Sequence, residues 1–268
     1  MNTKTKIGLF VAFIALAIDL ALYALKPLGD NSFIAADLLT IIFSSAAVAA
    51  GIYALKFHDI GSAYSKLLWL MVTGVFFWAI GEMLWGYQEI LLNTQNLTIS
   101  IADIFYLLGY PFFIFGIYSL FLILKDPITS NKKWIVLLVI AAAAVSVGIY
   151  GANSAIADPE QSTLGKAVTI GYVILDSFLL FGVIAVLLLF SGGKLTKPWI
   201  VILVAFILLI VADLYYTTVV STYVSEDAFT MLWDAYYVTL AFGFFYYRQT
   251  AEGVLKPQLA KAKKKMKS

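Results

Sequence analysis

Residues 99–118, with the sequence ISIADIFYLLGYPFFIFGIY, are long and apolar enough to cross a lipid bilayer, yet they include an acidic residue. Asp103 lies near the start of this stretch and Pro111 in its middle, with Tyr106 and Tyr110 between them. A charge at the bilayer centre costs about 3 kcal/mol even on insertion scales, so acids within a span usually face the bundle interior and mark a functional site. The stretch therefore predicts a membrane helix with one functional face.

The composition places the whole chain in the membrane class. Of its 268 residues, 62% are hydrophobic and 13% are charged, compared with about 45–50% and about 25% in soluble domains. The absence of cysteine excludes disulfides and thiolate chemistry. The single histidine, His58, excludes a metal site built from several histidines of one chain. We expect no cofactor.

Several further segments are long and apolar enough to cross a bilayer, which takes about 20 residues. Together with the first, the predicted spans cover residues 6–26, 33–55, 67–92, 100–124, 133–152, 165–190, 198–222 and 228–248. We therefore expect an all-α, polytopic membrane protein of eight transmembrane helices.

The distribution of lysines predicts the orientation of these spans. Lysines flank the even-numbered loops and both chain ends, whereas the odd-numbered loops contain more acids than lysines. Because positively charged loops stay inside, we expect a multi-pass protein of the cell membrane with both termini in the cytoplasm. The segment 251–268 contains six lysines and is expected to be a basic cytoplasmic tail. Either it attracts anionic lipids, or it is a solvated tail that only sets the topology.

A shift of 131 residues aligns the two halves of the chain without a gap. The residues that it superposes are Glu82 on Asp213, Trp85 on Tyr216, Asp103 on Asp234, Phe105 on Tyr236 and Tyr106 on Tyr237. A slightly larger shift places Asp37 on Asp176, whereas Asp19 has no counterpart. We predict two parallel four-helix repeats, residues 1–125 and 126–250, related by a pseudo-twofold axis along the membrane normal.

The candidate site consists of intramembrane acids and the aromatic residues one helical turn from them. Carboxylates beside aromatic faces suit a cation, because each ring adds about 0.5–2 kcal/mol of cation–π attraction. Counted from the inner lysines at the helical rise, most of these acids lie in the outer half of the membrane. The residues that we predict to bind a ligand are Glu82, Trp85, Glu89, Asp103, Tyr106, Tyr110, Asp176, Asp213, Tyr216, Asp234 and Tyr237.

Each of these acids also has a purely structural interpretation. Ser100 and Asp103 have the spacing of a capping box, so Asp103 could serve only to satisfy amides at a helix start. Glu82 and Asp213 are too deep for caps, but could be protonated and join helices by hydrogen bonds. Tryptophan and tyrosine also gather at membrane interfaces without any ligand. Both interpretations stay open at the level of sequence.

The helix pair WAIGEMLWGYQE and SIADIFYLLGYPFFIFGIY, with the tyrosine–aspartate element YVILDSFLL, resembles a membrane module. In archaea and bacteria this polytopic module precedes histidine kinases, PAS domains and diguanylate cyclases. The resemblance spans about residues 33–248 and rests mainly on Gly81, Glu82, Trp85, Ser100, Ala102, Asp103, Tyr106, Gly109, Tyr110 and Pro111. It implies an input role in signalling. The chain ends about twenty residues after the last predicted span, so we expect a separate membrane or cytoplasmic partner to carry the signal.

Our first hypothesis is a sensor that binds a cation, a proton or a small amphipathic ligand in an outer-facing acidic and aromatic cavity. One alternative is a secondary transporter coupled to protons or cations, which a duplication and intramembrane acids would also suit. Another is a structural subunit of a membrane complex. An enzyme is disfavoured because no serine–histidine pair and no cysteine is present. We expect no nucleic-acid partner.

Overall fold

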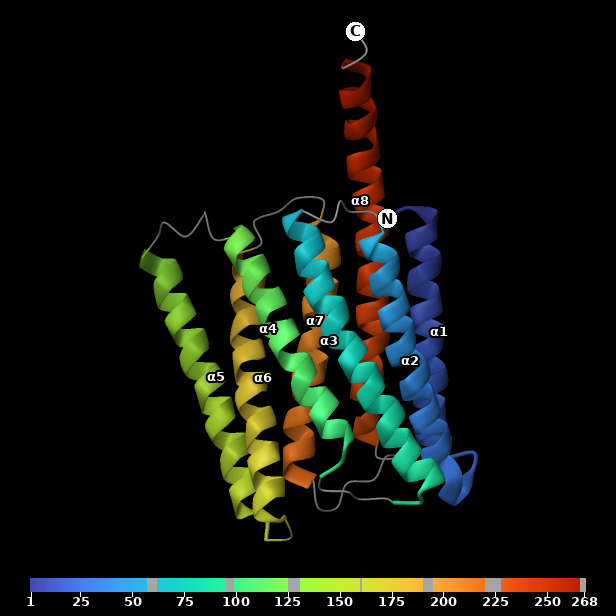
Figure 1. The fold of residues 1–268 in the computed structure, drawn as a ribbon, viewed down its shortest axis with the longest axis vertical. Helices are drawn as coiled ribbons and strands as arrows, with labels where there is room; N and C mark the ends of the chain where they lie inside the picture. Colours follow the sequence, from blue (N-terminus) through green and yellow to red (C-terminus); the bar gives the residue numbers. More distant parts are fainter. Residues whose placement is uncertain are drawn as a thin grey trace.

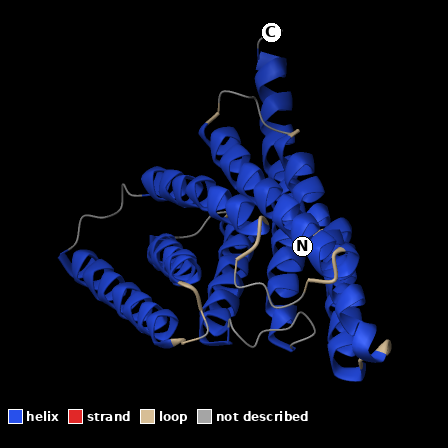
Figure 2. Cartoon of the chain, turned by 60° about the horizontal axis from the view of Figure 1, so that its bottom comes forward, coloured by secondary structure: helices blue, strands red, loops and turns tan. Residues whose placement is uncertain are grey.

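The computed structural model describes residues 1–56, 62–94, 99–124, 131–159, 161–189, 195–219 and 228–265, and within these ranges it is helical without strands (Figure 2). The long helices are α1 Thr3–Leu25, α2 Ser32–Leu55, α3 Ala63–Gly86, α4 Ala102–Leu124, α5 Asn131–Ala157, α6 Thr163–Leu189, α7 Thr196–Val219 and α8 Met231–Lys265. Single turns at Gly29–Asn31, Tyr87–Leu91 and Ala228–Thr230 flank α2, α3 and α8. Helix α4 continues through Pro111.

Seven of these helices, α1 to α7, are long and apolar enough to cross a membrane, as expected for a multi-pass membrane protein. Their outer faces expose large apolar side chains, such as Phe10 and Phe13 on α1 and Leu138 and Val139 on α5. Exposed apolar surface of this extent is unusual for a soluble protein and is what lipid would cover. The predicted boundaries of these spans agree with the helices to within a few residues at most ends.

Helix α8 differs from the other seven in composition and length. It is not apolar enough to qualify as a span, so the eighth crossing stays a prediction. Its tyrosines Tyr236, Tyr237 and Tyr247 are fully buried, because α8 packs between α1, α2 and α7. The helix also continues to Lys265 and projects beyond the bundle (Figure 1). The segment predicted as a separate tail from residue 251 therefore begins as a continuation of α8.

Six helices form a closed ring in the order α2, α3, α4, α6, α7 and α8, each packed on the next. Helix α1 lies outside the ring against α8 and α2, and α5 lies outside it against α6 and α7, at opposite flanks of the bundle (Figure 1). Within the six-helix ring, exchanging α2, α3 and α4 for α6, α7 and α8 leaves the order of neighbouring helices unchanged. The duplication and its axis stay a prediction.

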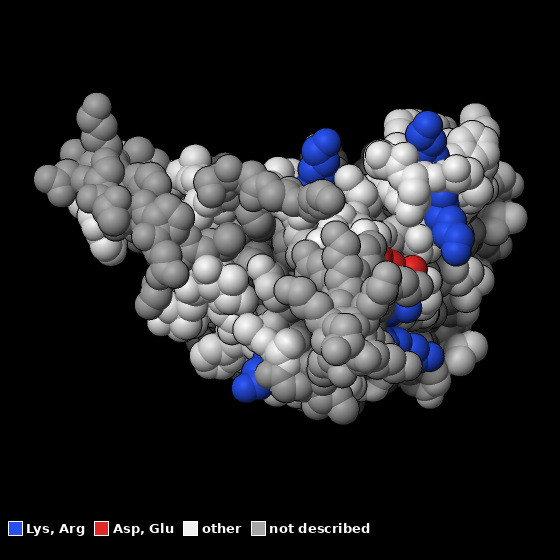
Figure 3. All heavy atoms as spheres, turned by 90° about the horizontal axis from the view of Figure 1, so that it is seen from above, with Lys and Arg blue, Asp and Glu red and all other residues white. Residues whose placement is uncertain are grey.

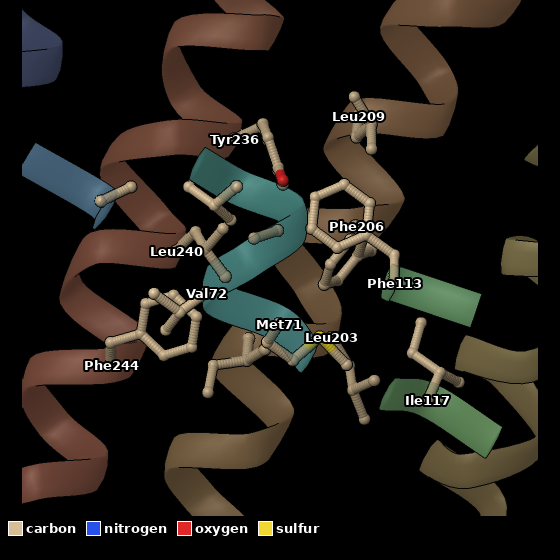
Figure 4. Packing of buried hydrophobic residues seen from close by; sticks show 14 of the residues in the cluster. Met71, Val72, Phe113, Ile117, Leu203, Phe206, Leu209, Tyr236, Leu240 and Phe244 are labelled. Atoms are coloured by element: carbon tan, nitrogen blue, oxygen red, sulfur yellow. The ribbon is translucent and has the colours of Figure 1, made fainter. Parts of the chain in front are cut away.

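The interior of the ring is filled with apolar and aromatic side chains at mid-height. Figure 4 shows Phe113 of α4, Phe206 of α7 and Tyr236 of α8 converging on α3. The ring centroids of Phe113 and Phe206 are 5.0 Å apart, and those of Phe206 and Tyr236 are 5.7 Å apart. Aromatic contacts at these distances prefer tilted or edge-on geometry, which these pairs adopt. The core thus separates the two ends of the ring.

Close packing of α3 on α4 depends on glycines that accept aromatic rings. A Cβ at Gly81 would lie 2.5 Å from the Tyr106 ring, and a Cβ at Gly109 would collide with the Trp78 indole. The Trp78 indole N–H also donates to the Tyr106 carbonyl oxygen at 2.9 Å. Tyr106 and Trp78 are therefore held in fixed positions between the two helices.

Both chain ends lie at the same end of the bundle (Figure 1). Figure 3 looks onto this end, where several basic side chains and a small acidic patch are visible among the described residues. The loops that follow α1 and α5 lie at the opposite end (Figure 1).

Candidate functional site

A cavity of about 110 Å³ lies inside the ring, at the end of the bundle opposite the chain termini. All six ring helices contribute to it. Four carboxyl, six aromatic and four threonine side chains line it: Asp37, Glu82, Asp103 and Asp213; Trp78, Trp85, Tyr106, Tyr172, Tyr216 and Trp233; Thr40, Thr169, Thr217 and Thr230. One water needs roughly 10–15 Å³ on this measure, so the space admits several waters or a small organic ligand.

The Glu82 carboxyl is held by two phenols from different helices. Tyr106 of α4 donates to Oε2 at 3.0 Å, and Tyr237 of α8 donates to Oε1 at 2.6 Å. Hydrogen bonds to an ionised acceptor are short and roughly twice as strong as neutral ones. Glu82 is thus fixed in orientation, and both of its carboxyl oxygens accept a hydrogen bond from the protein.

The Asp213 carboxyl on α7 is held in the same way. The Trp233 indole donates to Oδ1 at 2.7 Å, and the Tyr110 hydroxyl lies 3.0 Å from Oδ2. The Tyr110 hydroxyl also lies 2.7 Å from Asp176 Oδ1 on α6. A phenol has one proton to donate, so the second contact is fully satisfied when one of the two carboxyls carries a proton and donates it to the phenol oxygen.

Asp103 combines the two interpretations that the sequence left open. Its Oδ2 accepts from the Ser100 backbone N–H at 2.7 Å, and Ser100 Oγ accepts from the Ala102 N–H at 3.0 Å, as in a capping box. Its Oδ1 accepts from the Tyr172 hydroxyl of α6 at 2.7 Å, and the side chain lines the cavity. Asp103 is therefore both a helix cap and part of the cavity wall.

The structure brings most of the predicted ligand-binding residues to this cavity. Those that line it are Glu82, Trp85, Asp103, Tyr106, Asp213 and Tyr216. Tyr110, Asp176 and Tyr237 lie behind the wall and hydrogen-bond to one another or to its carboxylates. Glu89 and Asp234 are both buried but do not line the cavity.

Glu89 follows Trp78, Glu82 and Trp85 at helical spacing in the sequence, but it does not line the cavity, because the helix changes geometry before it. The regular α-helix ends at Gly86, and Tyr87–Leu91 forms a wider, π-type turn. A π-type turn has more residues per turn than an α-helix. Beyond Trp85, residues three or four positions apart therefore no longer lie on one face of the helix.

Sequence reasoning left several lining residues out of the predicted set. Tyr172 could have been predicted from the sequence, because it lies one helical turn before Asp176 in the tyrosine–aspartate element. Trp233 lies next to Asp234, but its contact is with Asp213 of another helix. The four threonines carried no signal, since threonine is common in membrane helices. His58 lies outside the described residues.

The lining residues that the structure describes give the cavity an acidic and aromatic wall, with no lysine or arginine among them. Within the described ranges, no group of three or more histidine or acidic side chains has the geometry to hold a metal ion. Chemically, such a wall can accommodate a positively charged organic group, with rings for its apolar part and carboxyl groups for its charge.

The chain was compared with family models, curated proteins and solved structures, and none of them matches it.

Proposed function

We propose that this protein is a membrane receptor of the sensor type whose cavity binds a small organic cation, such as an amine or a quaternary ammonium ion. The observation that carries the proposal is the cavity wall itself. Among the described residues, it combines four carboxyl groups with six aromatic rings and contains no lysine or arginine.

The hydrogen bonds behind the wall support a cationic ligand. Tyr106, Tyr237 and Trp233 all donate to the Glu82 or Asp213 carboxylate, so these groups are oriented before any ligand arrives. Binding is tighter when the site pays no ordering cost at the moment of association. A cation in the cavity would meet the fixed Glu82 and Asp213 carboxyl groups and would be stabilised by about 0.5–2 kcal/mol for each ring face that it contacts.

The rings also argue for an organic cation over a bare metal ion. Hard metal ions are bound by oxygen ligands, whereas the indoles of Trp78, Trp85 and Trp233 offer no oxygen. Recognition of methylated ammonium groups is the best-known use of such aromatic cages. The ligand class is therefore a compact ammonium ion with some apolar surface.

The sensor role rests on the resemblance to signalling input modules and on the position of the cavity. The ring core of Phe113, Phe206 and Tyr236 lies between the cavity and the end with the chain termini. If the basic end faces the cytoplasm, the cavity faces outward, as an input site would. We propose that the protein is not an enzyme and that a membrane or cytoplasmic partner reads changes in the ring helices.

The test is a thermal-unfolding and calorimetric titration of the detergent-purified protein. Probes are tetramethylammonium, choline and a primary amine, with sodium and magnesium chloride at matched ionic strength. A ligand specific to the folded state stabilises it by about 2.7 kcal/mol at a hundred times Kd. We expect a saturable shift with at least one ammonium probe that is lost in the Glu82→Gln/Asp213→Asn double variant.

The matched control is Glu252→Gln, which removes a carboxylate from the Arg248–Glu252 ion pair on α8. It should keep the full shift. If no ammonium probe shifts the wild type, or if the double variant responds like the wild type, the cavity is not a cation site. Flux of the same probe into proteoliposomes would replace the sensor hypothesis with the transporter alternative.

A further inference from the structure

Helix α1 packs on the bundle through Ala12, Ala15 and Leu16, but the side chains that it buries fully are polar. Its buried residues are Thr5, Asp19 and Tyr23, whereas Phe10 and Phe13 are 66% and 69% exposed. Membrane helices usually associate through small or apolar residues, supplemented by hydrogen bonds. A carboxyl group at the centre of such a contact needs a compensating charge or donor.

Among the described residues, Asp19 has no hydroxyl, amide or indole donor, and the one side chain with which it can form a hydrogen bond is another carboxyl. The Asp19 carboxyl lies against that of Asp234 on α8, and both side chains are 0% exposed. Within the ranges that the structure describes, three oxygens of the pair have no donor group within hydrogen-bond distance: both oxygens of Asp19 and Oδ1 of Asp234. The Tyr23 hydroxyl reaches Asp234 Oδ2 only at 3.4 Å. Two carboxylates in this position repel each other strongly in a medium of low dielectric constant.

The groups around the pair do not relieve this repulsion. Glu82 on α3 adds a further negative charge that acts on Asp234. Thr40 on α2, one turn after Asp37, reaches Asp234 with its hydroxyl, but donates to the Ala36 carbonyl oxygen at 3.1 Å. The Thr40 lone pairs thus stay available as a ligand.

The only ion pair within the described ranges is Arg248–Glu252, which lies more than three helical turns further along α8. No lysine or arginine of the described ranges therefore pairs with Asp19 or Asp234. What the two carboxyls lack is a positive charge.

We propose that Asp19 and Asp234, with the hydroxyl oxygens of Tyr23 and Thr40, form a site for one monovalent metal cation that docks α1 onto α8 and α2. The site joins three helices through two carboxyl and two hydroxyl groups. Hydroxyl and carboxylate oxygens are the ligands of hard cations. Calcium takes six to eight oxygens and magnesium retains several waters, whereas these four side chains offer at most six oxygens, of which Asp234 Oδ2 already contacts the Tyr23 hydroxyl.

This site is separate from the cavity, although Thr40 touches both. Asp19, Tyr23 and Asp234 do not line the cavity. The cation site and the ammonium site can therefore be tested independently.

The experiment is a thermal-unfolding series on the full-length protein in detergent, in low-salt buffer at constant pH. Sodium, potassium, calcium and magnesium chloride are titrated separately against the wild type, Asp19→Asn, Glu82→Gln and Glu252→Gln. We expect sodium to raise the Tm of the wild type saturably by about 5 °C. Asp19→Asn should lose this response and Glu252→Gln should keep it, while Glu82→Gln, which removes a charge that acts on Asp234, should weaken it without abolishing it.

The stability of Asp19→Asn also tests whether repulsion between the two carboxylates is what creates the cation site. In low-salt buffer Asp19→Asn should be at least as stable as the wild type, because it removes one of two facing negative charges at nearly constant volume. Sodium should then reverse that order. Hydrogen exchange of residues 3–25 should slow on addition of sodium in the wild type and stay unchanged in Asp19→Asn.

Three outcomes would overturn the proposal. One is a sodium response that is equal in the wild type and Asp19→Asn. Another is stabilisation by calcium or magnesium but not by sodium, which would make the site divalent. The third is dependence on pH alone with no effect of any metal ion, which would mean that the two carboxyls share only a proton.

Discussion

Glu82 and Asp213 at the cavity wall are half-buried and the Asp19–Asp234 pair is fully buried, and the two sets differ in how their oxygens are satisfied. Around the cavity, phenol and indole donors reach Glu82 and Asp213 at 2.6–3.0 Å. At the α1–α8 contact, both oxygens of Asp19 and one of Asp234 lack a hydrogen-bond partner among the described residues. The same type of side chain therefore has two different electrostatic settings, a few helical turns apart.

The difference indicates two modes of cation recognition. A carboxylate that is already hydrogen-bonded keeps its orientation without a ligand, so it can act as one wall of a receptor site that is occupied only at times. A carboxylate with no donor is costly unless a cation or a proton is present, so its partner is expected to be part of the folded structure. The following variants test this distinction.

The largest expected effect is on ammonium binding by Glu82→Gln. Removing the charge while keeping the shape should lower affinity by about 2–3 kcal/mol, or roughly 30- to 150-fold. The amide oxygen of the substituted side chain can still accept a hydrogen bond from Tyr106 or Tyr237, so the Tm without ligand should change little. Isothermal titration with the best ammonium probe checks this, and an unchanged Kd would exclude Glu82 from recognition.

Tyr110→Phe should have the largest effect on stability. It removes the hydroxyl that contacts both Asp176 and Asp213. Leaving buried acceptors without their donor costs about 1–3 kcal/mol. The matched control is Tyr23→Phe, whose contact with Asp234 is longer at 3.4 Å and which should cost less than about 1 kcal/mol. Equal losses of Tm for the two variants would remove the distinction between the two regions.

Gly81→Ala tests whether the orientation of the carboxylate matters in addition to its charge. The new Cβ would lie 2.5 Å from the Tyr106 ring, so the ring must move and lengthen its 3.0 Å contact with Glu82. We expect ammonium affinity to fall by about 1 kcal/mol, or roughly fivefold. A comparable change in Gly253→Ala, where open space surrounds the glycine, would show that the effect is not local.

The smallest effect should come from Glu252→Gln. Its ion pair with Arg248 joins residues four apart on one helix at 2.7 Å, with side chains 13% and 20% exposed. Such pairs contribute about 0.3–0.5 kcal/mol on exposed helices. The variant should therefore leave both cation responses intact and shift Tm by about 1–2 °C at most. A larger shift would mean that this end of α8 contributes to folding more than its contacts suggest.

Much of the fold follows from local properties of the chain. The apolar runs predict the seven helices that can span a membrane, because the length and composition of a span are set by the bilayer. The same reasoning also predicts a helix over 228–248, where α8 begins, but not its continuation to Lys265, and α8 is less apolar than the other seven because its buried tyrosines Tyr236, Tyr237 and Tyr247 contact other helices. Hydropathy predicts which helices contact lipid, whereas α8 is surrounded mostly by α1, α2 and α7.

Helical periodicity places Glu82 and Trp85, or Asp103 and Tyr106, on common faces, and the cavity contains all four. It fails for Glu89, where the helix widens into a π-type turn. It also offers no means of finding Trp233 as the partner of Asp213, since that contact depends on how α7 and α8 are packed.

The sequence by itself determined that the chain is helical, that most of its helices suit a membrane, and that carboxylates with aromatic neighbours lie within them, because these properties depend on composition and spacing along one helix. Only the tertiary structure decided which carboxylates share a cavity, which phenol reaches which oxygen, and that Asp19, which has no counterpart at the repeat offset, faces Asp234. Those relations join residues up to 215 positions apart, and they exist only once the helices have packed.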